Sequence, residues 1–142
     1  GRAVAGNWDA LTLKAPMGEP STQVALLDSV TEVTPDHAGK IVVTGSHGGV
    51  SAAHYARAVA ARLYVFNDAG VGKDEAGIAA LTSLEAQGIA AVTVSHVSAR
   101  IGEARDAWDC GVISNVNARA ARLGLRPGVA LKLAVAALTD AD

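Results

Sequence analysis

Polar side chains that could do chemistry gather directly after three short apolar runs of this chain. The runs 41–44, 63–66 and 90–94 lead into Gly45-Ser46-His47-Gly48-Gly49, Asn67-Asp68-Ala69-Gly70 and Ser95-His96-Val97-Ser98-Ala99-Arg100, respectively. Continuous apolar runs of this length, each followed by a helical pattern, are typical of buried parallel strands. Ligands of open α/β sheets bind beyond the carboxyl ends of such strands. The spacing therefore predicts a site where these clusters meet.

The first cluster offers a hydroxyl nucleophile and backbone amides. Thr44-Gly45-Ser46-His47-Gly48 approximates the nucleophile elbow of α/β-hydrolases, with Thr44 in place of the first glycine. Ser46 is accordingly a candidate catalytic nucleophile, or else a hydrogen-bond donor to substrate. The amides near Gly48 and Gly49 could hold a carboxylate, a phosphate or an oxyanion at the start of the next helix. The alternative is a glycine turn that only lets strand and helix pack closely.

Two histidines and one aspartate supply candidate acid–base groups. His47 and His96 follow neighbouring apolar runs, and an imidazole exchanges protons near neutral pH. Asp68 follows the run between them, where its carboxylate could orient a histidine or act as a base. Asp68 could equally cap the glycine turn, and each histidine could be a hydrogen-bonded structural residue. We predict His47, Asp68 and His96 as catalytic residues beside Ser46.

Three further polar residues of these clusters are candidates for substrate binding. Arg100 could clamp a carboxylate with its planar guanidinium, or pair with Glu103 or Asp106 on the surface. Ser98 shares a strand face with His96 if the strand continues. Asn67 could donate an amide hydrogen to substrate or form the turn. We predict Gly48, Gly49, Asn67, Ser98 and Arg100 as substrate-binding residues.

Nucleotide and metal sites are not predicted. Gly70-Val71-Gly72-Lys73 lacks the upstream glycine and the following Ser or Thr of a P-loop, whose positions hold Asn67 and Asp74. Glycines are not spaced as in a dinucleotide fingerprint. Tight metal-ligand spacing such as His-x-x-x-His is missing from the sequence. We therefore expect no cofactor and no metal.

Residues 41–49 and 63–77 resemble the layout of caspase-like cysteine peptidases. A strand ending in Ser-His-Gly is followed by a strand ending in a short polar turn, and that family carries its nucleophilic cysteine at the second turn. Here the second turn is Asn67-Asp68-Ala69-Gly70, and the single cysteine is Cys110. The resemblance therefore does not extend to cysteine-peptidase chemistry, and Cys110 is interpreted as a packed, inert thiol.

The elements that must position these clusters alternate along the chain. Strands are expected at 24–27, 41–44, 63–66 and 90–94, and helices at about 50–62, 74–87, 101–111, 115–123 and from 127 onward. Asp74 and Asn115 are expected to cap helices, and Gly88 and Gly124 to end them. This order predicts one three-layer α/β/α domain over 23–142, with a mainly parallel sheet of four or five strands. Residues 1–22 are expected to form an N-terminal arm.

Composition and charge limit the classes of partner and the location expected for this 142-residue chain. Its net charge of −2 comes without a basic run, so we expect no nucleic-acid partner. Apolar stretches are too short to span a membrane, and no signal-peptide pattern is evident. One cysteine fits a reducing cytoplasm. Half of the residues are hydrophobic but only 4% are aromatic, so the core has little volume and we expect a homo-oligomer.

Together these patterns predict a small cytoplasmic enzyme that acts on a small polar or anionic metabolite. Hydrolysis is favoured over lyase or isomerase chemistry, although the same groups could serve all three. The alternative is a non-catalytic ligand-binding or regulatory subunit that uses the same pocket.

Overall fold

The computed structural model describes residues 19–140, so most of the expected arm at 1–22 lies outside the described residues. The strands are β1 (Val24–Leu27), β2 (Ile41–His47), β3 (Leu63–Asn67), β4 (Ala91–Val94) and β5 (Ile113–Val116). The α-helices are α1 (Val50–Ala56), α2 (Ala79–Ala86), α3 (Ala104–Cys110), α4 (Ala118–Arg122) and α5 (Leu131–Asp140). Short 3-10 helices are η2 (Val30–Glu32), η3 (Pro35–His37) and η4 (Lys73–Ile78).

The five strands form one sheet in the order β1-β2-β3-β4-β5. The three pairs from β1 to β4 are parallel, whereas β5 runs antiparallel to β4. The carboxyl ends of β2, β3 and β4 therefore lie at one edge, as the sequence predicts. This mixed, mostly parallel sheet with flanking helices confirms the predicted α/β class.

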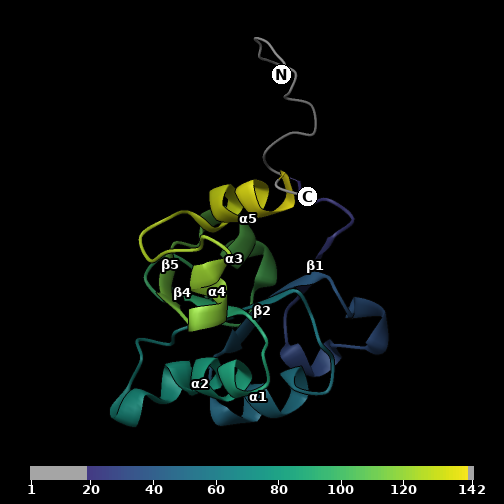
Figure 1. Ribbon diagram of the computed structural model, residues 1–142. Coiled ribbons are helices and arrows are strands. Elements are labelled where there is room, and N and C mark those ends of the chain that lie inside the picture. The colour runs from purple at the N-terminus through teal and green to yellow at the C-terminus, as the bar shows by residue number, and fades with distance from the viewer. Residues whose placement is uncertain (1–18, 141–142) are drawn as a thin grey trace.

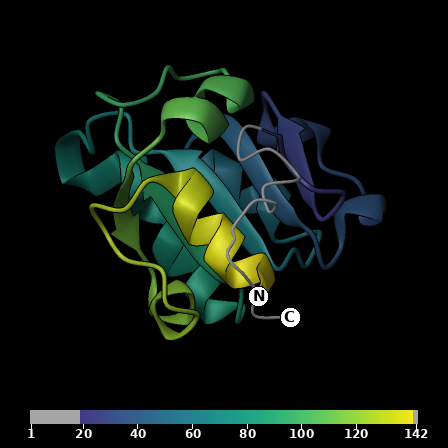
Figure 2. The ribbon, with the colours of Figure 1, turned by 90° about the horizontal axis from the view of Figure 1, so that it is seen from above.

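Helices cover both faces of the sheet (Figures 1 and 2). Alternate strand residues point to opposite faces, so each apolar strand supplies two cores. Val42, Tyr64 and Phe66 pack in the cluster that α1 and α2 complete. Val43 and Val65 belong to the other cluster, with residues of α3 and α5. Leu131, Val135 and Leu138 are buried on one face of α5, as their helical spacing predicts.

Two predicted helix-capping residues are wrong. Asp74 does not cap a helix: it lies inside η4 with φ 57°, and α2 begins only at Ala79. The glycine-rich segment before it turns through left-handed backbone conformations, which leaves no extended residue at the cap position. Asn115 lies within β5, and Asn117 is the residue that caps α4 by accepting a hydrogen bond from the Ala120 amide.

Other helices are shorter than predicted, because local turns end or delay them. Helix α1 ends at Ala56, and the chain then turns toward β3 through a bond from the Ala61 amide to the Val59 carbonyl (2.9 Å). Helix α3 begins at Ala104, after Gly102 with φ 89°. Gly88 and Gly124 both have positive φ after helices, which confirms them as helix ends.

The exposure of Cys110 differs from the sequence prediction. Cys110 is exposed at the end of α3, so the prediction of a packed thiol is wrong: the buried face of α3 carries Ala104, Ala107 and Trp108 instead.

Within residues 19–140, no helix combines the length and the apolar character that crossing a membrane would require.

Candidate active site

Asp68 and His96 are brought into direct contact at the carboxyl ends of β3 and β4. Oδ1 of Asp68 lies 3.2 Å from Nδ1 of His96 and accepts the His96 backbone amide at 3.1 Å. The same oxygen accepts the Gly70 amide at 2.8 Å. Because strand β3 pairs with β4 in parallel register up to Asn67↔Val94, the residues just beyond those ends meet. The structure thus brings these two predicted residues together.

The Asp68 carboxylate is buried but strongly hydrogen-bonded. Its side chain is 8% exposed, against 50% for the His96 side chain. Burial raises the pKa of Asp68, but hydrogen bonds from the Ser114 side chain, the Gly70 amide and the amide and ring of His96 outweigh that effect. The net result is a pKa below the ordinary value, so Asp68 is a carboxylate at neutral pH.

An ionised carboxylate only accepts hydrogen bonds, and this determines which nitrogen of the His96 imidazole carries the proton. The proton of neutral His96 must lie on Nδ1, which faces Asp68, so Nε2 keeps its lone pair. The ring lies against Gly70, where a Cβ atom would come within 3.5 Å of its Cε1 atom. Since the His96 side chain is half exposed, this arrangement can take a proton from solvent or a ligand. We call Asp68 and His96 the dyad.

Ser46 lies on the β1 side of strand β2, whereas the dyad lies beyond β3 and β4. Its Oγ accepts the Val30 amide at 2.9 Å, at the turn that follows β1. Among the described residues, no hydrogen bond joins Ser46 to the dyad. The hydroxyl hydrogen stays available, but the contact with η2 gives Ser46 a structural role where strand β1 ends.

His47 and the two glycines end β2 beside β3. His47 is exposed and pairs in register with Asn67, while the Gly48 amide donates to the Asn67 carbonyl at 3.0 Å. That amide is therefore engaged within the sheet edge instead of facing a ligand. The His47 ring covers Gly49, where a Cβ would lie 2.8 Å from Nε2. Within residues 19–140, no hydrogen bond connects His47 with the dyad.

The other predicted substrate-binding groups have partners of their own. Asn67 donates to the Ala99 carbonyl (2.9 Å) and accepts the Ala69 amide (2.8 Å), so it ties two loops together. Ser98 donates to the Ser95 carbonyl (2.8 Å) and accepts the Val112 amide (2.9 Å). Arg100 is 79% exposed and lies 3.9 Å from Glu103, which is the surface pairing that the sequence left open.

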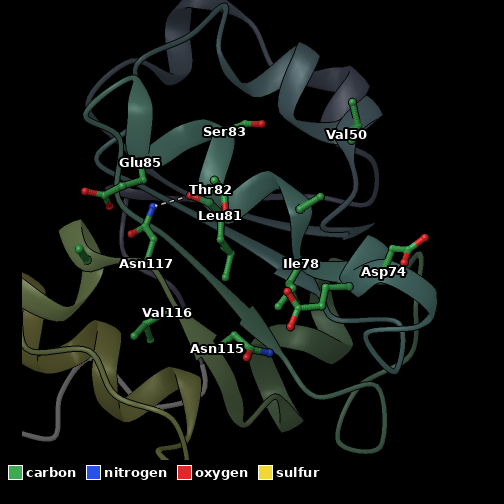
Figure 3. Close-up of a pocket in the computed structure, with 13 residues that line it drawn as sticks. Val50, Asp74, Ile78, Leu81, Thr82, Ser83, Glu85, Asn115, Val116 and Asn117 are labelled. Atoms are coloured by element: carbon green, nitrogen blue, oxygen red, sulfur yellow. Dashed lines mark hydrogen bonds between the residues drawn. The ribbon is translucent and has the colours of Figure 1, made fainter.

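A cavity of about 600 Å³ lies apart from these residues, between η4, α2 and the β5–α4 segment (Figure 3). Ile78, Leu81 and Val116 provide apolar lining, and Asn115 adds an amide. None of the predicted catalytic residues lines this cavity. Its size is typical of small-molecule sites.

The sequence did not point to Ser114 and Thr93, whose side chains meet where β4 pairs with β5. The Ser114 side chain helps to lower the pKa of Asp68, and its Oγ lies 2.9 Å from Oγ1 of Thr93. Ser114 falls in a segment whose pattern suggests a helix start, so its position in a strand beside β4 was not evident. A signal did exist: Ile113 and Val116 are apolar residues flanking two polar ones, after a glycine.

A metal centre finds no support in the described part of the chain, where no group of three or more His, Cys, Asp or Glu side chains could hold an ion. Comparisons with protein-family models, curated sequences and solved structures found no match for this chain. The functional interpretation therefore depends on the geometry of the site itself.

Proposed function

We propose that the protein is a small hydrolase in which His96, oriented by Asp68, acts as the general base on water. The observation that carries this proposal is the hydrogen bond from Nδ1 of His96 to a buried, ionised carboxylate. Such a contact leaves Nε2 as the proton acceptor and stabilises the imidazolium that forms. Water is the favoured nucleophile because Ser46 accepts a hydrogen bond from Val30 and, within residues 19–140, has no hydrogen bond to the dyad.

In the proposed step, Nε2 of His96 takes a proton from water while the water oxygen bonds to an electrophilic carbonyl carbon. The bond from that carbon to its leaving group then breaks, and the imidazolium returns the proton to the leaving group. Asp68 remains a carboxylate throughout. A small polar metabolite is the favoured substrate, because the predicted anion-binding groups Gly48 and Arg100 are engaged with Asn67 and Glu103.

A second candidate function is ligand binding without turnover. The cavity of about 600 Å³ favours it, because this cavity has a size suited to a small molecule and lacks the predicted catalytic residues. The two functions differ in one respect that can be measured: only the hydrolase needs His96.

The test is a panel of small esters, amides and lactones incubated with the protein and with two histidine variants. We expect His96→Gln to lower turnover by roughly 10²- to 10⁴-fold, the usual contribution of a general base. His54→Gln is the matched control, since His54 is exposed on α1, and it should keep full turnover. Loss of turnover must occur with an unchanged circular dichroism spectrum. A folded His96→Gln protein with full activity would contradict the proposal.

A further inference from the structure

The cavity of about 600 Å³ carries negative charge that its own lining does not neutralise. Asp74, Glu75 and Glu85 line it, and among the described residues that line it none is Lys, Arg or His. Figure 3 shows Glu85 at one end of the cavity and Asp74 at the other, with Leu81 and Ile78 between them. The cavity therefore combines apolar walls with carboxylates at both ends.

These carboxylates keep the capacity to accept hydrogen bonds from a ligand. Asp74 and Glu75 are exposed, and within residues 19–140 their carboxylates accept no hydrogen bond and form no ion pair. Glu85 accepts the Arg119 backbone amide at 2.9 Å with one of its two oxygens. The Arg119 guanidinium lies against Gly88, where a Cβ would come within 2.8 Å of Nη2. Since a carboxylate accepts several hydrogen bonds, acceptors remain on all three side chains.

The two asparagines of the lining offer an acceptor but no free donor. Nδ2 of Asn115 donates to Oγ1 of Thr93 at 3.2 Å and to Oγ of Ser114 at 3.4 Å, so the side-chain carbonyl is the group left for a ligand. The Asn117 side chain is fully engaged by four backbone groups. Hydroxyl groups, which can donate or accept, complete the polar lining at Thr82 and Ser83.

The spread of the carboxylates favours an extended organic ligand over a metal ion. In the described part of the chain, no three His, Cys, Asp or Glu side chains lie together so that they could hold an ion. Ile78, Leu81 and Val116 provide apolar surface between the carboxylates. Val50, which also lines the cavity, is 74% exposed, so an apolar ligand group placed there would remove this surface from water.

We propose that this cavity binds a small organic cation, in which an ammonium group is carried on an apolar body. An ammonium group donates three hydrogen bonds and accepts none, which complements a lining rich in acceptors. The carboxylates attract its charge, and the apolar body packs against Leu81 and Val116. This inference gives a ligand class to the second candidate function and does not depend on acid–base chemistry at His96.

Four matched probes test this ligand class: phenylpropylamine, phenylpropanol, phenylpropanoate and propylamine. Calorimetry gives each dissociation constant, and the methyl NMR signals of Ile78, Leu81 and Val116 locate the bound probe. We expect phenylpropylamine, which is charged at neutral pH, to bind about tenfold more tightly than the alcohol and to shift these signals. Phenylpropanoate should bind more weakly still, because the carboxylates repel it. Propylamine should lose about tenfold or more, because it lacks the ring.

Two double variants with equal changes in net charge test the carboxylates. Asp74→Asn with Glu75→Gln should raise the dissociation constant of phenylpropylamine about fivefold and leave that of phenylpropanol unchanged. The control is Glu32→Gln with Asp36→Asn, at exposed residues that do not line the cavity, and it should bind both probes as the wild type does. Should the first variant fail to fold, Glu85→Gln, which keeps an oxygen for the Arg119 amide, must weaken the amine likewise.

Equal affinity for the amine, the alcohol and the carboxylate, or no binding of any probe, would overturn the inference. Shifts at the His96 ring in place of the cavity methyl groups would do the same. The hydrolase proposal is decided separately: His96→Gln should bind phenylpropylamine as the wild type does. If the wild type turns over no substrate but binds the amine in the cavity, the hydrolase proposal fails and this inference stands. If His96→Gln abolishes turnover while the amine does not bind, the reverse holds.

Discussion

Asp68 combines burial with a negative charge because donors from two separate parts of the chain reach the same carboxylate oxygen. The Gly70 amide lies in its own turn, and the His96 amide and ring follow β4. Any one donor could be supplied by a simple turn cap, as the sequence alone allowed. Their convergence on a carboxylate beside a half-exposed imidazole is what favours chemistry over capping.

Tyr64 provides a test of burial at the scale of one residue. Burial raises its pKa from 10.0 to about 12, and its hydroxyl donates to the Val59 carbonyl at 2.6 Å. Between pH 10 and pH 12 the unfolded chain loses this proton while the folded chain keeps it. Stability that is fully present below pH 10 therefore falls by about 3 kcal/mol as pH rises toward 12.

Urea unfolding of the wild type and Tyr64→Phe at pH 8 to 11.5 measures this loss. The variant should be about 1 kcal/mol less stable at pH 8, because the Val59 carbonyl loses one of its two donors and keeps only the Ala61 amide, and it should show a flatter alkaline decline. Tyr55→Phe, at a residue 41% exposed, is the control and should keep the wild-type slope. Equal slopes in all three proteins would contradict the account of Tyr64.

At the scale of elements, the segment between β4 and α3 crosses the carboxyl ends of the neighbouring strands. The Gly102 amide donates to the Gly45 carbonyl at 2.7 Å, and the Ala104 amide donates to Asp28 at 2.9 Å. Gly45 permits this approach, since a Cβ there would lie 2.8 Å from Gly102 Cα and closer still to the Glu103 amide. Backbone of this crossing segment therefore occupies part of the sheet edge at which the sequence predicts the site.

Gly45→Ala should push the crossing segment away from β2. We expect the unfolding free energy to fall by about 1–3 kcal/mol, as for other overpacked sites, and hydrogen exchange of the Gly102 amide to become faster. Gly39→Ala is a useful comparison: no atom lies within 4 Å of a Cβ there, although φ is +76°. It should cost stability through backbone strain but leave exchange at Gly102 unchanged. Unaltered exchange in Gly45→Ala would show that the crossing does not depend on this glycine.

The elements were predictable from the sequence where the chain is uniformly apolar. Continuous runs such as 41–44 and 63–66 can only be buried, so their strands and the parallel order followed directly. Strand β5 was not recognised as a separate element, because Ile113–Val116 is short, half polar and followed by helix-forming residues. The candidate site follows the same pattern: Asp68 and His96 come directly after uniformly apolar strands, whereas the half-polar segment of β5 carries no such signal.

At the scale of the whole molecule, one sheet edge separates the candidate groups into three places. Ser46 lies toward β1 and His47 ends β2 beside Asn67, and of the four predicted catalytic residues, all within the described part of the chain, only Asp68 and His96 are hydrogen-bonded to each other. The order of strands in the sequence predicts which residues lie at the carboxyl edge of the sheet. The hydrogen-bonded loops over that edge determine which of these residues come into contact. The expected homo-oligomer stays a prediction, which the mass in sedimentation equilibrium would decide.

We propose that Asp68 keeps the proton of His96 on Nδ1 and leaves Nε2 free. Nitrogen-15 NMR of the neutral His96 ring at alkaline pH reads the position of this proton directly. We predict the Nδ1-protonated form in the wild type and its loss in Asp68→Ala, where no carboxylate remains to accept the proton. A wild-type ring protonated on Nε2, or a form that Asp68→Ala does not change, would contradict the account.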